Sequence, residues 1–227
     1  MAEPRYPAKE KYKHGEAAEN YATRRFRPDV DEREHAMVRG LVARCEGARR
    51  ILDAPCGTGR MTSFATGAEL SVALDVSYDM VARVDPASAR RIVGDCERLP
   101  LRADACDLAL SIRFLHHLPS EELLERCLRE LARVSSRWVL VSYYRSTTLQ
   151  YARRVLKRIL SGRTSHRIGR TWRQFRAVAT RACLRPAAVR TSAPFISEQY
   201  FVLFEKVVDG EARGESAGSA GARAPQR

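Results

Sequence analysis

Short apolar runs and longer amphipathic stretches alternate along most of this chain. Apolar runs bounded by turn residues predict strands at residues 51–53, 70–75, 91–95, 106–111, 138–142, 187–195 and 199–206. Apolar residues at helical spacing predict helices at residues 29–45, 120–134, 149–160 and 172–182, with another beginning near Arg60. The alternation of the two kinds of element indicates an α/β fold.

A glycine turn follows the first predicted strand. Asp53 ends the apolar run, and the segment Ala54-Pro55-Cys56-Gly57-Thr58-Gly59 comes next. Gly57 and Gly59 allow the backbone to bend sharply and a ligand to lie against it. A dinucleotide site would place a third small residue at position 62, where this chain has Thr62. The turn therefore indicates a nucleotide-like ligand but argues against a dinucleotide.

Chemically distinctive residues follow the next three predicted strands. Asp75 ends the second strand, 22 residues after Asp53, where the hydroxyl pair of a ribose needs an acceptor. Asp95 ends the third strand and is followed by Cys96-Glu97-Arg98-Leu99-Pro100-Leu101. The fourth strand ends at Ser111 and leads into Phe114-Leu115-His116-His117-Leu118.

These segments, in this order over roughly residues 48–145, resemble the motifs of the class I S-adenosylmethionine-dependent methyltransferases. The general resemblance is to the small-molecule branch that includes quinone-biosynthesis C-methyltransferases. It implies a doubly wound, Rossmann-like sheet of seven strands, mostly parallel with a C-terminal antiparallel strand, and helices on both faces. An unrelated doubly wound domain is the alternative.

The same resemblance implies how the cofactor S-adenosylmethionine is held. The glycine turn would hold its amino-acid end, and the Asp95 carboxylate would accept from the adenine amino group. The implied cofactor-binding residues are Asp53, Pro55, Cys56, Gly57, Thr58, Gly59, Asp75, Asp95, Cys96 and Ser111.

The remaining segments predict a cap, a core and a tail. Residues 1–47 are expected to form an N-terminal helical cap, whose first helix, 15–26, carries Tyr21 and Arg25 in a loose match to the family's Tyr-x-x-x-Arg. Residues 48–208 are expected to form the core, with a basic helical insert at about 146–183. Residues 209–227 are rich in Gly, Ala, Ser and Arg and are expected to be disordered. Ser135-Ser136-Arg137 replaces the family's Pro-Gly-Gly before the fifth strand.

Composition predicts a cytoplasmic protein with reduced thiols. The first 13 residues are polar and charged, unlike a signal peptide, and no run approaches the roughly 18 apolar residues of a membrane span. The six cysteines show no Cys-x-x-Cys pair and no metal-ligand spacing, so no metal site is expected.

Nearly all of the positive charge lies in one segment. Residues 132–197 contain 15 Lys and Arg and no Asp or Glu, whereas the whole chain has a net charge of +13, which leaves −2 for the remainder. Within this segment an apolar stripe of residues 149–160 lies opposite Arg153, Arg154, Lys157 and Arg158. This segment could form a lid over the acceptor, or a surface that binds an anionic membrane or RNA. Alternatively, its apolar stripes pack on the core and its basic residues only form a solvated face.

Candidate catalytic residues cluster after the fourth strand, at the sheet edge where such folds bind ligands. His116 is the first candidate for a general base, followed by His117, and Arg113 is a candidate anchor for an acidic acceptor. A hydrogen-bonded structural role at the turn is the alternative for the histidine pair. Tyr143 and Tyr144 are candidate walls of the acceptor pocket.

The sequence favours methyl transfer to a small or lipid-like acceptor, with an anionic acceptor and peripheral contact with an anionic membrane as further expectations. Ser111-Ile112-Arg113-Phe114 lacks both prolines of the motif used to methylate nucleobase amines, so nucleic acid is disfavoured. The alternatives are an RNA methyltransferase that uses the basic segment and a non-catalytic cofactor-binding partner protein.

Overall fold

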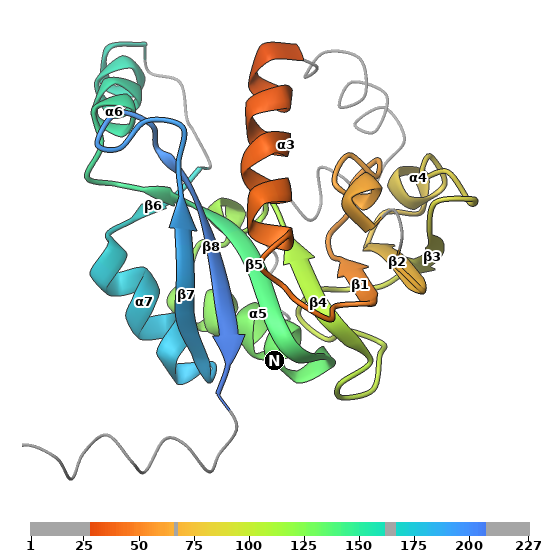
Figure 1. Cartoon of the computed structure of the whole chain (residues 1–227). Coiled ribbons are helices and arrows are strands. Elements are labelled where there is room, and N and C mark those ends of the chain that lie inside the picture. Colours follow the sequence, from red (N-terminus) through yellow and green to blue (C-terminus); the bar gives the residue numbers. More distant parts are fainter. Residues whose placement is uncertain (1–27, 66–67, 162–166, 208–227) are drawn as a thin grey trace, which may run out of the picture.

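One eight-stranded sheet organises the protein (Figure 1). The computed structural model describes residues 28–65, 68–161 and 167–207, with side chains from Asp31 onward. Seven strands are paired in the order β3-β2-β1-β4-β5-β8-β7. The eighth strand, β6, pairs with β5 and is not part of this order. The strands are β1 Arg50–Asp53, β2 Leu70–Asp75, β3 Arg90–Val93, β4 Cys106–Ser111, β5 Ser135–Arg145, β6 Gly169–Arg170, β7 Leu184–Arg190 and β8 Gln199–Lys206.

The predicted doubly wound, mostly parallel sheet is confirmed, with two corrections. The prediction of seven strands missed β6, whose two residues pair in parallel with the end of β5. The strand predicted at 187–195 is β7, which ends at Arg190 because Thr191-Ser192-Ala193-Pro194 has the composition of a turn. The C-terminal strand β8 is antiparallel to both of its neighbours, as expected.

Helices cover both faces of the sheet (Figure 1). On one face, α3 (Pro28–Val42) places Val38 and Leu41 against apolar side chains of β4, β5 and β8. On the other face, α5 (Glu121–Val134) and α7 (Trp172–Arg181) enclose the larger apolar cluster. Alternate residues of β4 enter the two clusters, since successive strand side chains point to opposite faces.

Hydroxyl side chains set several of these boundaries. Ser120 begins α5 by accepting the Leu123 N–H at 3.2 Å, as predicted from the sequence. The chain passes directly from α5 into β5 without a Pro-Gly-Gly turn. Ser135 makes this junction, because its hydroxyl donates to the Trp138 carbonyl at 2.7 Å and replaces a turn hydrogen bond.

The helix predicted from about Arg60 is wrong. A turn at residues 57–61 is followed by the short 3₁₀ helix η1 (Thr62–Ala65). Thr62 and Ser63 are poor helix formers, and the Thr62 hydroxyl donates to the Asp53 carboxylate at 3.0 Å. The next helix, α4 (Tyr78–Val81), packs beside β2 and β3.

The two helices of the predicted basic insert behave differently. α7 buries Phe175, Val178 and Ala179 in the core, whereas none of the described residues of α6 (Leu149–Ser161) is buried. Figure 1 shows α6 standing beyond the end of the sheet. All six cysteines are free thiols, and no described helix has the length and apolar character needed to cross a membrane. The predicted helix 15–26, with Tyr21 and Arg25, and the predicted tail 209–227 lie outside the described residues.

Candidate active site

The glycine turn at the end of β1 packs closely against its neighbours. Cys56 donates its backbone N–H to the Leu74 carbonyl of β2 at 2.8 Å, so the turn lies across the end of the adjacent strand. Gly57 and Gly59 both have positive φ, at 55° and 85°. Glycine is favoured at position 59 by its φ, and a Cβ there would also lie tightly, 3.1 Å from a Val84 methyl.

Asp75 ties this turn to the end of β2. Its Oδ2 accepts the Gly57 N–H at 2.9 Å, and its Oδ1 accepts the Ser77 N–H at 3.0 Å. Burial raises the pKa of Asp75, while these two hydrogen bonds favour the ionised form. An ionised carboxylate has about four acceptor positions, so both oxygens can still accept hydroxyl groups of a ligand.

Asp53 lies behind the turn, and its carboxyl group is 3% exposed. Burial raises its pKa to about 7, the Thr62 hydrogen bond lowers it, and the nearby Asp75 raises it further. Two acidic side chains therefore lie close together at the ends of adjacent strands. This arrangement favours a ligand that brings positive charge.

Asp95 and Cys96 follow β3 at the same sheet edge, and Cys56 lies in the glycine turn. The Asp95 carbonyl accepts the Arg98 N–H at 3.0 Å in a short backbone bridge, and the Asp95 Oδ1 accepts the Glu97 N–H at 3.0 Å. Burial raises the pKa of the Cys56 and Cys96 thiols, so both are neutral near pH 7. They therefore contribute small apolar surfaces.

Arg113 follows β4 and forms part of a charge cluster that the sequence analysis missed. Its guanidinium lies 3.6 Å from Glu34 and 3.9 Å from Asp31, both on α3. Arg60, from the glycine turn, makes closer contacts with the same two acids, including 2.7 Å to Glu34. The cluster fastens α3 across the glycine turn and the end of β4. Its members come from three distant segments and share no spacing that the sequence could reveal.

The histidine pair and the tyrosine pair predicted from the sequence lie in different surroundings. His116 is 2% exposed, and its ring stacks on Tyr144. Burial, with His117 as the next cause, lowers the pKa of His116 well below its usual range, so the ring is neutral at pH 7. Tyr143 points to the other face of the sheet, where it stacks on Phe175 in the core. Of the two predicted tyrosine walls, Tyr144 lines the cavity described next, whereas Tyr143 is not among the described residues that line it.

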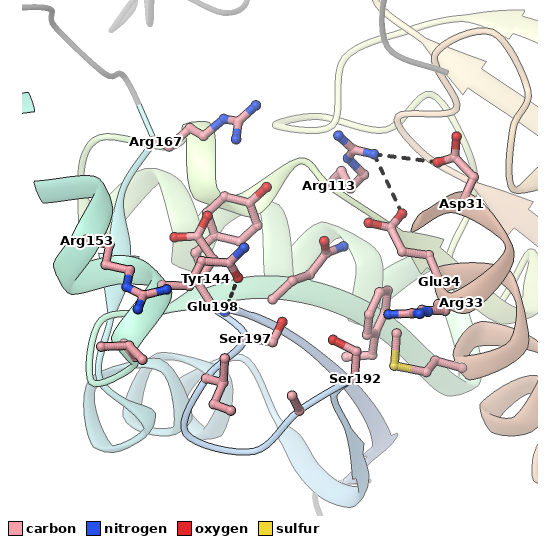
Figure 2. Close-up of a pocket in the computed structure, with 17 residues that line it drawn as sticks. Asp31, Arg33, Glu34, Arg113, Tyr144, Arg153, Arg167, Ser192, Ser197 and Glu198 are labelled. Atoms are coloured by element: carbon pink, nitrogen blue, oxygen red, sulfur yellow. Dashed lines mark hydrogen bonds and ion pairs between the residues drawn. The ribbon is translucent and has the colours of Figure 1, made fainter. Parts of the chain in front are cut away.

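That cavity, of about 640 Å³, lies between α3, α6 and the loop that precedes β8 (Figure 2). Four guanidinium groups line it, from Arg33, Arg113, Arg153 and Arg167, and three acids do so, Asp31, Glu34 and Glu198. Figure 2 shows Arg113 and Arg167 above Tyr144, reaching toward the cavity from different elements. Neither His116 nor His117 is among the described residues that line it.

The glycine turn and the cavity share one edge of the sheet. The strand order reverses between β1 and β4, and the space beyond the carboxyl ends of the strands at such a point is where doubly wound folds bind ligands. Asp53, Gly57 and Asp75 lie on the β1–β2 side, while Arg113 and Tyr144 lie on the β4–β5 side. The molecule therefore presents two adjacent binding regions of different chemistry.

Ser111, at the end of β4, bears on whether a nucleoside ligand fits. Its hydroxyl is fully buried and has no hydrogen-bond partner among the described residues. Buried polar groups are normally paired, so this hydroxyl is available to a ligand. With the acceptors on Asp75 and the close-packed glycine turn, the residues present suit the polar groups of S-adenosylmethionine.

Comparison with known proteins supports the predicted methyltransferase domain over part of the chain. Residues 52–138 match the family model described as a methyltransferase domain. The chain is 32% identical over 84 residues to a tRNA (carboxymethyluridine(34)-5-O)-methyltransferase of Arabidopsis thaliana, a match that covers 37% of this chain and 20% of that protein. It is 37% identical over 92 residues to a malonyl-[acyl-carrier protein] O-methyltransferase of Pectobacterium atrosepticum, covering 38% and 34%. The matches thus span about a fifth and about a third of the length of these two curated relatives.

Solved structures share the fold. A magnesium protoporphyrin IX methyltransferase from Synechocystis, with bound S-adenosylhomocysteine, aligns with a TM-score of 0.64 and 18% identity over 78% of this chain and 83% of that one. A possible histamine N-methyltransferase from Thermotoga maritima aligns with a TM-score of 0.62 and 16% identity over 83% and 97%. These likenesses establish the Rossmann-like methyltransferase fold.

Proposed function

We propose that this chain, in which residues 52–138 match the methyltransferase-domain family, transfers the methyl group of S-adenosylmethionine to an acidic oxygen of a small or lipid-like acceptor. The observation that carries the proposal is the position of the cavity. Arg113 of this cavity shares Glu34 with Arg60 of the glycine turn, and both segments lie at the strand-order reversal, so an acceptor and a cofactor would meet there.

Different residues are proposed to bind different parts of S-adenosylmethionine. Gly57 and Gly59 would hold its amino-acid end, Asp75 the ribose hydroxyls, and Asp95 the adenine amino group. Pro55, Cys56, Thr58 and Cys96 would form the walls, and the Ser111 hydroxyl would gain a partner. The buried acids Asp53 and Asp75 provide a negative environment for a cationic ligand.

The bound cofactor supplies a methyl group on a sulfonium, which is a good leaving group. The protein must therefore chiefly align the acceptor and exclude water. Helix α3 would exclude water on one side of the site. Ion pairs between its acidic residues and both Arg60 and Arg113 hold it there. Arg113 is the proposed anchor for a negatively charged acceptor, because its contacts to α3 are longer than those of Arg60.

An acidic oxygen is favoured because four guanidinium groups line the cavity and suit a negatively charged acceptor. A carboxylate is already deprotonated at pH 7, so its methylation needs no proton acceptor. His116 is buried and neutral, and neither histidine lines the cavity among the described residues. We assign the pair a positioning role, with His116 as the support of Tyr144. The printed names of both curated relatives also describe O-methylation.

RNA is the second candidate acceptor, and a specific observation favours it. One curated relative is named as a tRNA methyltransferase, and residues 132–197 of this chain carry 15 basic residues without an acid. An RNA substrate would place a nucleotide in the cavity and its phosphates on the basic surface. The lipid-like alternative follows from the resemblance to quinone-biosynthesis enzymes.

The test is to incubate the full chain with S-adenosylmethionine labelled in the methyl group and with separated acidic-metabolite, lipid and RNA fractions of a cell extract. The proposal expects label in the metabolite or lipid fraction, released by mild alkali as expected of a methyl ester. Asp75→Ala is the control, because its weaker cofactor binding should reduce labelling of every fraction at a limiting concentration of S-adenosylmethionine. Alkali-resistant label, or label confined to RNA, would contradict the acidic-oxygen proposal.

A further inference from the structure

Helix α6 is amphipathic, and its apolar side faces outward. Leu156, Ile159 and Leu160 are 56, 69 and 78% exposed, and Leu149 at the start of the helix is 47% exposed. A helix packed on a core turns such a stripe inward, as α7 does with Phe175 and Val178. The alternative that both predicted apolar stripes pack on the core is therefore wrong for α6, which buries none of its described residues.

The inward side of α6 is fixed by polar and aromatic contacts. Arg154 forms an ion pair with Glu198 at 2.9 Å, and its guanidinium lies over the rings of Tyr144 and Tyr151. The ring of Tyr151 packs directly against Gly169, and a Cβ added to Gly169 would lie only 2.2 Å from that ring. Rotating the apolar stripe inward would break all of these contacts. The outward stripe is therefore set by the packing of the helix.

The loop before β8 extends the same apolar surface. Phe195 and Ile196 are 73 and 56% exposed, and their carbonyls accept the N–H groups of Leu149 and Gln150 at the start of α6. Phe195 has a φ of 62°, a conformation that bulky residues rarely adopt. We name this surface the α6 patch. It comprises Leu149, Leu156, Ile159, Leu160, Phe195 and Ile196.

Basic side chains border the patch. Arg153, Lys157 and Arg158 are exposed on α6, and residues 132–197 contain no acid. Large exposed apolar surfaces rimmed by charge mark interaction sites. A second copy of this chain would bring like charges together across the patch. RNA would find mostly aliphatic side chains, with Phe195 as the single aromatic member of the patch, and aliphatic side chains offer neither stacking platforms nor hydrogen bonds to bases.

We propose that the α6 patch docks on the surface of an anionic lipid bilayer. The helix has 13 residues, too few to span a membrane, so it would lie in the plane of the interface. Its aliphatic side chains enter the acyl boundary, and Arg153, Lys157 and Arg158 contact lipid phosphates. Leu149, Arg153 and Ile196 also line the cavity beside Tyr144, so docking places the cavity next to the lipid.

The test is flotation of the full chain with phosphatidylcholine vesicles, with and without phosphatidylglycerol. We expect binding to the anionic vesicles that weakens with salt. The double substitution Ile159→Asp and Leu160→Asp should weaken binding roughly tenfold or more, as should Lys157→Glu with Arg158→Glu. Val93→Asp is the matched control, because Val93 is an exposed aliphatic residue outside the patch, and it should bind as the parent does.

The proposal does not rest on methyl transfer, since docking needs no cofactor. Asp75→Ala should therefore bind vesicles as the parent does, even if the proposed function fails. Thermal unfolding of each variant checks the fold, and all substituted patch residues are exposed. Equal vesicle binding by parent and patch variants would overturn the proposal. So would a dimer that the patch variants dissociate, or retention of RNA without vesicle binding.

Discussion

The ring of His116 lies flat against that of Tyr144, with centroids 3.9 Å apart and planes 1° from parallel. Tyr144 in turn lines the cavity and carries the guanidinium of Arg154 over its ring. The histidine that the sequence suggests as a base thus supports the wall of the acceptor pocket.

His116→Phe separates these two roles. It keeps an aromatic plane against Tyr144 and removes both ring nitrogens. We expect kcat to stay within a few-fold of the parent, with an unchanged pH profile between pH 6 and 8. A general base would make the loss on the order of 10²–10⁴-fold. His116→Ala is the companion variant, because losing the stacked ring should destabilise the fold by roughly 1–3 kcal/mol.

Asp53→Asn should stabilise the free protein at pH 8. Burial raises the pKa of Asp53 to about 7 from an ordinary 3.8, so between these pH values the folded state holds a proton that the unfolded state releases. Stability from this group therefore falls as pH rises from 4 to 7, and the loss is at most roughly 4 kcal/mol. Thermal unfolding should show a gain for Asp53→Asn at pH 8 and little change at pH 4.

Asp107→Asn provides a control of opposite sign. Hydrogen bonds from Arg50 and from the Arg49 N–H hold the pKa of Asp107 at about 2, even though partial burial opposes them. Removing that charge should destabilise the protein at pH 8.

The proposed function adds that Asp53→Asn, although more stable, binds S-adenosylmethionine more weakly, because a negative charge is lost near a cationic ligand. Destabilisation by Asp53→Asn at pH 8 would contradict the burial argument.

Arg113→Ala should raise the KM for an acidic acceptor on the order of ten- to a hundredfold, the usual cost of a charge-assisted hydrogen bond. The dissociation constant for S-adenosylhomocysteine should stay within about threefold. Arg60→Ala is the matched control, since it also loses contacts to Asp31 and Glu34 but is not proposed to contact the acceptor. An equal KM increase in both variants would mean that only the attachment of α3 had been disturbed.

Asp95→Ala should reduce the preference for adenine over hypoxanthine in the cofactor. The Asp95 carboxylate accepts the Glu97 N–H, which fixes its position at the β3 edge. Competition binding with S-adenosylhomocysteine and its inosine analogue measures the preference. Equal preference in variant and parent would assign adenine recognition to the backbone.

The sequence predicted well those elements that local pattern determines. β2 and β4 have the predicted bounds, and Ser120 begins α5 as expected, because apolar runs and caps act within a few residues. The two-residue strand β6 has no periodicity of its own. The helix after the glycine turn was wrong because Thr62 bonds to Asp53, an interaction between segments nine residues apart.

The site was predictable only in part, because local sequence patterns do not reveal contacts between distant segments. The glycine turn and the two acids were visible because each follows a strand. The link between Arg60, Arg113 and α3 joins three segments, and no local pattern marks it. The orientation of α6 was also hidden, since periodicity identifies an apolar stripe but not its direction. That direction depends on Glu198, which lies 44 residues beyond Arg154.

Calorimetry with S-adenosylhomocysteine on the parent chain and on Asp75→Ala tests the central claim most directly. Ser77→Ala is the control, since it removes only a cap hydroxyl and keeps the N–H that Asp75 accepts. We predict binding by the parent and by Ser77→Ala, and binding weaker by roughly ten- to a hundredfold in Asp75→Ala, from the loss of about 1.5–3 kcal/mol. Undiminished binding by Asp75→Ala, or tighter binding of a nicotinamide dinucleotide by the parent, would contradict the account.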